Sequence, residues 1–358
     1  MPLLLRTLLT ALLIGPKEGL CPPDIQEYIL SYLPLSDLIS LASVSSVEGE
    51  IHGHIKGRVT KLLVKTGVNH EGLLDVMRRT GTVISGSAAL EVAVPGSCTP
   101  KDLNLYCGLG KADETAALLL EDSAYEKIPN PVTAKMSERR RIETFDLNNG
   151  VSQILRFKHK SGLTLSLIES LSHSPLAPIF FFHNTLMMNC ITGDEVISFY
   201  PLLSRTMTGL KNHRSARPGT HSPAKIKEWE SWGCNIIDNC DTEHTNHVFW
   251  NPVPKHGFCH HEYRSTIDKY CARISFSPTT KPKVVGPSLC WRLGFDIRRE
   301  TYTTRNSPVV VISTAGWPKD LAERATARSG SIVWHTYAAP LLSDAETVDP
   351  CLWKRSFP

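Results

Sequence analysis

The chain has 358 residues, of which 41% are hydrophobic and 21% charged. This composition excludes an intrinsically disordered chain and predicts a globular protein of about two or three domains. The net charge of +4 arises from 39 basic and 35 acidic residues, and this near balance argues against a dedicated nucleic-acid-binding protein. The ten cysteines show no tight, evenly spaced framework, so they do not predict a disulfide scaffold.

Residues 1–17 form an apolar N-terminal segment that is shorter than the roughly 20 apolar residues needed to span a bilayer. We favour a docking helix over a signal peptide, because Arg6 lies inside the apolar run and no small-x-small cleavage site follows before Pro16. The signal-peptide interpretation stays open. Because the chain contains no Asn-x-Ser/Thr sequon, we expect a cytoplasmic or nuclear protein without membrane contact.

Residues 18–65 predict a helical domain that begins with a pair of short helices. Ile25 and Ile29 recur at four-residue spacing after Pro22 and therefore share one helical face. The first helix should end at Leu33, because the following proline lacks an N–H and disfavours helical geometry in the residue before it. A second helix should then carry Leu38 in an apolar stripe.

Two short helices broken at Leu33-Pro34, with an acidic residue at the start of each, resemble an F-box. The F-box is the module that docks on the adaptor subunit of cullin–RING ubiquitin ligases. Cys21 stands where an F-box usually has leucine, so this anchor would bury less apolar area. The alternative is a helical hairpin that packs only on its own domain. The resemblance implies that the adaptor contacts Pro22, Ile25, Ile29, Leu33, Pro34 and Leu38.

Apolar residues from Ile51 to Leu62 recur at helical spacing and predict a third helix. Gly49, Gly53 and Gly57 also recur every four residues, which would allow a close helix–helix contact along the glycine face.

Residues 70–210 alternate helix and strand patterns, as an α/β domain does. In chain order we expect a helix ending near residue 81, a strand over 82–84, a helix over 87–93, a strand over 102–106, a helix over 111–121, and a hairpin over 151–169 with its turn near residues 160–162.

The segment VISGSAAL at 83–90, followed by DLNLY at 102–106, resembles the nucleotidyltransferase superfamily. The resemblance implies that Gly86 and Ser87 hold phosphates at a helix start, and that three carboxylates on two strands bind divalent metal. Asp102 occupies the first acid position, but Asn104 and Ser166 occupy the other two. Glu169 should face away from Ser166, because side chains alternate along a strand.

We therefore expect a degenerate pocket on a non-catalytic scaffold, and no enzyme. A divergent nucleotidyltransferase or nucleotide-binding protein is the alternative, and an unrelated α/β domain also stays open. Together with SPLAPIFFFHNT at 174–185, MMN at 187–189 and CWRLG at 290–294, these features resemble an expanded group of mushroom-type fungal (basidiomycete) proteins. Those proteins combine an F-box-like start with a degenerate nucleotidyltransferase-like domain.

Residues 211–224 are basic and rich in Pro, Gly and Ser, and they predict a boundary or exposed loop before a mixed, β-rich region over 225–358. That region holds a group of potential zinc ligands without a CxxC pair. We therefore favour reduced thiols and surface histidines over a metal site, and zinc binding stays open as the alternative. We expect no cofactor. The members of the group are Cys234, Cys240, His244, His247, His256, Cys259, His260, His261 and Cys271.

The expected architecture is α+β, with an N-terminal helical F-box-like hairpin, a central nucleotidyltransferase-like α/β domain and a C-terminal β-rich region. The expected function is that of an interaction protein, the substrate receptor of a cullin–RING ubiquitin ligase. Its partners would be the adaptor subunit and a protein target that the sequence does not identify.

Overall fold

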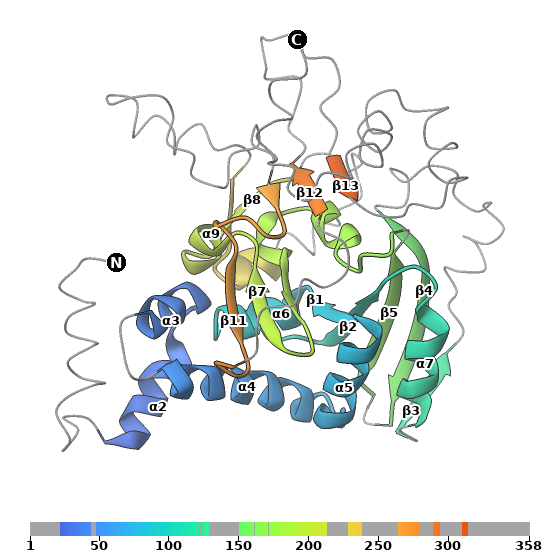
Figure 1. Ribbon diagram of the computed structural model, residues 1–358, viewed down its shortest axis with the longest axis horizontal. Coiled ribbons are helices and arrows are strands. Elements are labelled where there is room, and N and C mark those ends of the chain that lie inside the picture. Colours follow the sequence, from blue (N-terminus) through green and yellow to red (C-terminus); the bar gives the residue numbers. More distant parts are fainter. Residues whose placement is uncertain are drawn as a thin grey trace, which may run out of the picture.

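The fold mixes helices with a central sheet (Figure 1). A computed structural model describes residues 22–43, 48–121, 124–128, 150–160, 162–170, 172–212, 228–237, 264–279, 289–293 and 310–313. No helix within these ranges has the length and apolar character needed to cross a membrane.

The chain starts with three helices, α2 (Pro23–Tyr32), α3 (Leu35–Ala42) and α4 (Glu48–Lys65). Helix α2 ends where Leu33 takes an extended conformation, with φ −77° and ψ 130°, immediately before a proline. The predicted helix break is therefore confirmed, and its cause is the steric restriction that proline places on the preceding residue.

The glycine face of α4 makes no close helix contact, so that prediction was wrong. A Cβ added at Gly49, Gly53 or Gly57 would meet no other described atom within 4 Å. The opposite, apolar face of α4 does the packing, and its Ile51 and Ile55 are fully buried. Burial of branched apolar side chains removes more surface from water than a glycine contact could, so the apolar face decides which side turns inward.

Three further helices follow the predicted pattern: α5 (His70–Thr80), α6 (Ser87–Ala93) and α7 (Ala112–Glu121). Asn69 caps α5, because its side chain accepts a hydrogen bond from the Gly72 N–H at 3.3 Å. Gly81 ends the same helix in the left-handed conformation, with φ +71°, which favours glycine.

The central sheet has eight strands in the order β11-β7-β6-β1-β2-β5-β4-β3. The β2–β5 pair is parallel, and the other neighbouring pairs are antiparallel. The predicted hairpin is confirmed as β4 and β5. The strands are β1 (Val83–Ser85), β2 (Asp102–Cys107), β3 (Tyr125–Ile128), β4 (Val151–His159), β5 (Thr164–Ser170), β6 (Asn189–Ile191), β7 (Glu195–Ser198) and β11 (Ala272–Ser275).

Strand β11 comes from the region that was expected to form a separate β-rich part, yet it extends the central sheet beside β7. The other strands form two small sheets, β8 with β9 and β10 with β12 and β13. The remaining elements are η2 (Ala177–Phe181), η3 (Thr185–Met187), α9 (Pro201–Arg205), β8 (Thr208–Leu210), β9 (Asn235–Ile237), β10 (Arg264–Ser265), β12 (Leu289–Arg292) and β13 (Val310–Ser313).

Two hydrophobic cores lie on the two faces of the sheet. The first contains buried residues of α2 to α7 together with those of one sheet face. The second lies on the other face and centres on aromatic rings, with Phe180 stacked on Trp291 at 3.9 Å between centroids. The N-terminal helices therefore share a core with the α/β part of the molecule.

Candidate docking site

Helix α2 presents apolar and aromatic side chains to solvent. Ile25 is 45% exposed, and Tyr28 and Tyr32 are each 62% exposed. Spacings of three and four residues place all three on one helical face, with the half-buried Ile29 beside them. The tyrosine rings meet edge to face with centroids 5.0 Å apart. We call these four residues the docking face.

The structure distributes the predicted docking residues between surface and core. Pro22 and Ile25 are exposed, and Ile29, Leu33 and Pro34 are partly buried. Leu38 is a correction, because its side chain is 0% exposed and packs inside the first core. The apolar stripe of α3 is already covered by the chain itself, so Leu38 supports the helix pair rather than offering a contact.

The sequence prediction missed Tyr28 and Tyr32. Their signal was present, since two tyrosines four residues apart form a pair on any α-helix. The four-residue spacing of Ile25, Ile29 and Leu33 drew attention to a stripe that rotates slowly around the helix, because α-helices have 3.6 residues per turn. At its C-terminal end that stripe has turned inward.

The end of α2 is held by the guanidinium of Arg58 in α4. Arg58 donates hydrogen bonds to the carbonyl oxygens of Leu30 at 2.5 Å and Leu33 at 2.7 Å, and to that of Val92 at 3.1 Å. The last carbonyls of a helix lack the N–H partners of a further turn. The Leu30 carbonyl already accepts the Leu33 N–H at 3.2 Å, and Arg58 adds a second donor there and supplies one to Leu33. Burial lowers the pKa of Arg58 to about 10, against the raising effect of Glu27 and Glu91.

His54 lies between Arg58 and Glu27. Its Nε2 accepts a hydrogen bond from Arg58 Nε at 3.0 Å, and its Nδ1 lies 3.1 Å from the Glu27 carboxylate. Because Nε2 acts as an acceptor, the proton is assigned to Nδ1 and the ring is neutral. Burial and the charge of Arg58 lower the pKa of His54, while Glu27 raises it less.

A neighbouring histidine joins α4 to the sheet edge. His52 Nδ1 lies 2.5 Å from the carbonyl oxygen of Ser275, the last residue of β11. The docking face is thus positioned by a helix that is itself fixed to the central sheet.

The predicted nucleotide pocket brings its residues onto neighbouring strands. Gly86 precedes α6 with φ +81°, a conformation that favours glycine. In the strand register Asn104 lies beside Ser85 on one side and Ser166 on the other. Asn104 Nδ2 donates to the Asp102 carboxylate at 3.4 Å. Asn104 therefore lies beside Asp102 and Ser166, and Asp102 is the one carboxylate among these three residues.

Two residues near this pocket differ from what a metal site requires. Glu169 faces the other side of the sheet, as predicted, and accepts hydrogen bonds from the backbone N–H groups of Gly110 at 2.8 Å and Ala112 at 3.4 Å. It therefore caps α7. Arg156 lies opposite Ser166 in the strand register, and within the described residues its buried Nε has no hydrogen-bond partner. A guanidinium at this place disfavours a cation.

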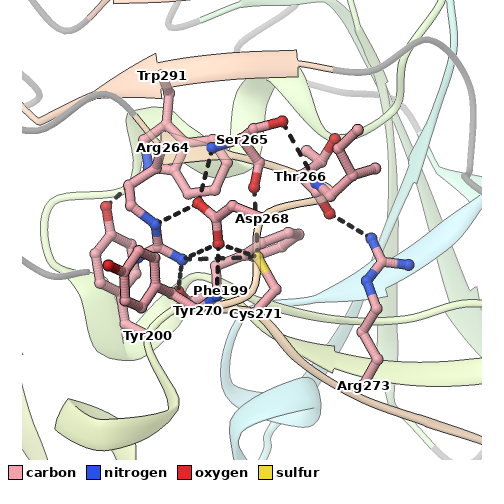
Figure 2. Close-up of polar contacts among 11 residues, drawn as sticks. Phe199, Tyr200, Arg264, Ser265, Thr266, Asp268, Tyr270, Cys271, Arg273 and Trp291 are labelled. Atoms are coloured by element: carbon pink, nitrogen blue, oxygen red, sulfur yellow. Dashed lines mark hydrogen bonds and ion pairs between the residues drawn. The ribbon is translucent and has the colours of Figure 1, made fainter. Parts of the chain in front are cut away.

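A separate cluster of polar side chains surrounds Arg264, which is 2% exposed (Figure 2). Its Nε donates to Asp268 Oδ2 at 2.6 Å and its Nη2 to Oδ1 at 3.0 Å. The guanidinium lies 5.0 Å from the ring centre of Tyr200 and 5.4 Å from those of Tyr270 and Trp291. Its charge is thus matched internally, so the cluster ties β10 to the core rather than awaiting a ligand.

Of the predicted Cys and His cluster, the structure describes Cys234 and Cys271, and the other members lie outside the described residues. Burial raises the pKa of Cys271 to about 12, so it is a protonated thiol. In the ranges that the structure covers, no group of three His, Cys, Asp or Glu side chains could hold a metal ion.

Comparison with protein families matches the F-box domain over residues 20–46. Comparison with curated proteins and with solved structures gives no match. The matched segment contains α2, the break at Leu33-Pro34 and α3. It therefore includes the whole docking face, and this chain carries an F-box domain, a protein-interaction module, at residues 20–46.

Proposed function

We propose that this protein is the substrate receptor of a cullin–RING ubiquitin ligase, and that α2 binds the adaptor subunit. The observation that carries the proposal is the docking face. Within the F-box match, Ile25, Tyr28 and Tyr32 are exposed, whereas Leu35, Leu38 and Leu41 of α3 are used by the chain's own core. Exposed aromatic residues beside an aliphatic one are the composition that protein interfaces favour.

Aspartate substitutions on the docking face test this proposal. In the double variant Tyr28→Asp/Tyr32→Asp, charge replaces two apolar contacts on the exposed face, so adaptor affinity should fall about tenfold or more. Purified adaptor and receptor are titrated against each other by calorimetry. Ile267→Asp is the matched control, because Ile267 is 59% exposed and lies outside the F-box. Equal affinity of the double variant and the control would remove the proposal.

The α/β part is proposed as a non-catalytic, nucleotidyltransferase-like scaffold that carries the target-binding surface. The neutral Asn104 and Ser166 and the nearby Arg156 support this, since two-metal chemistry needs carboxylates at these positions. The similarity to fungal F-box-like proteins stays a prediction from the sequence. A cytoplasmic or nuclear location is proposed with the ligase role.

The alternative is a nucleotide-binding protein or divergent nucleotidyltransferase that uses Ser87 and Asp102. Two observations favour this alternative. Asp102 and Asn104 lie two residues apart in β2 and therefore on the same face, and Asn104 pairs with Ser85, the residue before Gly86 at the start of α6. Magnesium-dependent binding of a nucleoside triphosphate to the parent and to Asp102→Ala separates the two proposals. Weaker binding in Asp102→Ala supports the alternative, and indistinguishable titrations remove it.

A further inference from the structure

A groove of about 510 Å³ is lined by residues of helices α5 and α7. In Figure 1 these two helices lie toward the opposite end of α4 from α2. Pockets that hold ligands typically have about 300–1,000 Å³. The groove lies in none of the surfaces that the sequence singled out.

The floor of the groove is apolar, whereas its exposed lining as a whole is polar and apolar in similar measure. Leu73, Val76, Leu119 and Tyr125 line it, and each is between 3% and 6% exposed. The Tyr125 hydroxyl already donates to the Thr66 carbonyl oxygen at 3.1 Å, so it is engaged below the surface. This floor can contact one aliphatic or aromatic side chain.

The rim of the groove is acidic. Asp75 and Arg79 line it as an ion pair, with Arg79 Nε 2.9 Å from Asp75 Oδ2. Glu121, the last residue of α7, also lines it, and its exposed carboxylate contacts no partner among the described residues. Two carboxylates against one guanidinium leave a net negative charge, which attracts a cation.

We propose that this groove binds a peptide segment of the target protein, in which an apolar side chain adjoins a lysine or arginine. The apolar side chain enters between α5 and α7, and the cation pairs with Glu121. This inference rests on the proposed receptor function and specifies its substrate class. In Figure 1, α2 lies at the left of the helical layer and α5 and α7 at its right, so the adaptor and the target can bind together.

A charge reversal tests the proposal. The probes are three fluorescent libraries of short peptides, with a fixed Leu-Arg, Leu-Glu or Ala-Arg pair between degenerate polar positions. The parent should bind the Leu-Arg library about two- to fivefold more tightly than Leu-Glu, because exposed ion pairs contribute modestly, and more tightly than Ala-Arg. Glu121→Lys should reverse the Leu-Arg to Leu-Glu preference.

Glu126→Lys provides the matched control. Glu126 is exposed, follows Tyr125 in β3 and therefore faces the other side of the sheet, so its reversal should leave the preference unchanged. Absence of binding by all libraries, no reversal in Glu121→Lys, or an equal reversal in Glu126→Lys would overturn the proposal.

Adaptor binding is measured on the same variants and separates this inference from the proposed function. Glu121→Lys should bind the adaptor as the parent does. If the protein binds the adaptor but shows no preference among the peptides, the groove proposal is refuted and the receptor proposal is retained. If Glu121→Lys reverses the preference between the Leu-Arg and Leu-Glu libraries but the protein does not bind the adaptor, the groove proposal is retained and the receptor proposal is refuted.

Discussion

Arg58, which is partly buried, and Arg264, which is 2% exposed, show two ways of placing a guanidinium in this protein. Arg264 pairs with the Asp268 carboxylate and lies against three aromatic rings. Burial alone would lower its pKa, but the Asp268 hydrogen bond and charge, together with Tyr200 and Cys271, raise it. Arg58 donates to backbone carbonyls, meets no carboxylate within hydrogen-bond distance in the described part of the chain, and has a pKa lowered to about 10 by burial.

A charged side chain inside a protein can therefore have either of two kinds of partner, a carboxylate or backbone carbonyls. A guanidinium that meets a carboxylate is compensated and fixes two segments of the chain together. A guanidinium that meets carbonyl dipoles remains less compensated, but it can serve several backbone groups at once. At Arg58 those groups are the end of α2 and Val92 in α6, so the arginine links the docking helix to the α/β part.

The largest effect should come from removing the carboxylate at Arg264. Asp268→Ala leaves a buried and unpaired guanidinium, and the free energy of unfolding should fall by about 3–5 kcal/mol. Urea denaturation measures it. The double variant Arg264→Met/Asp268→Leu removes both charges and should be less destabilised than Asp268→Ala. A double variant as unstable as the single one would show that ion pairing is not what stabilises the cluster.

A smaller loss of stability, accompanied by a loss of binding, should follow from Arg58→Met. A buried carbonyl that loses its hydrogen-bond donor lowers the free energy of unfolding by about 1–3 kcal/mol. Because the end of α2 can fray and expose its carbonyls to water, the total loss should be roughly 2–3 kcal/mol. Because α2 carries the docking face, adaptor affinity should fall as well. Calorimetric titration of folded protein should show no such fall in Asp268→Ala.

Arg58→Lys sharpens this prediction. An ammonium keeps the charge but lacks the fork of donors that reaches three carbonyls, so it should restore only part of the stability. Full restoration of both stability and adaptor affinity by lysine would contradict the assignment of Arg58 to the helix end.

The smallest effect should appear as a pH dependence at His54. Since the folded state lowers the pKa of His54, the unfolded chain binds more protons near pH 6.5, and stability should fall as pH decreases from 7 to 5. The charged groups facing the ring are Arg58, Glu27 and Lys61. His54→Gln should show a weaker pH dependence over this window, as measured by urea denaturation at a series of pH values.

The Arg264 cluster should respond in a different window. The Arg264 hydrogen bonds and charge lower the pKa of Asp268 despite its burial, so this contribution is present above the ordinary aspartate pKa of 3.8 and is lost below it. Stability in His54→Gln should therefore still fall at pH values below about 4. A His54→Gln protein with an unchanged loss between pH 7 and 5 would assign that loss to other groups.

Local features of the fold were predictable because they depend on neighbouring residues. The break at Leu33-Pro34 follows from proline sterics, the start of α6 from the glycine at position 86, and β2 from the alternation at 102–106. The same holds for the side of β5 on which Glu169 lies.

Features that depend on distant partners were not predictable. The apolar stripe of α3 could have faced an adaptor or its own core. In the structure α3 packs against α4, α9 and β11, and Leu38 is buried. The sequence of β11 has the pattern of any short strand, so its pairing with β7 could not be predicted from it. Arg264 depends on Tyr200 and Trp291, which are remote in the chain.

The bond between His52 and Ser275 joins residues that are 223 positions apart. It sets an order on synthesis, because the N-terminal helices leave the ribosome long before β11 exists. Closing such a non-local contact requires the intervening chain to be organised first, which slows folding. Helices α3 and α4 are thus synthesised well before β11, against which both pack, and until residue 275 is available this part of their surface stays uncovered, which exposes that stage to misassembly.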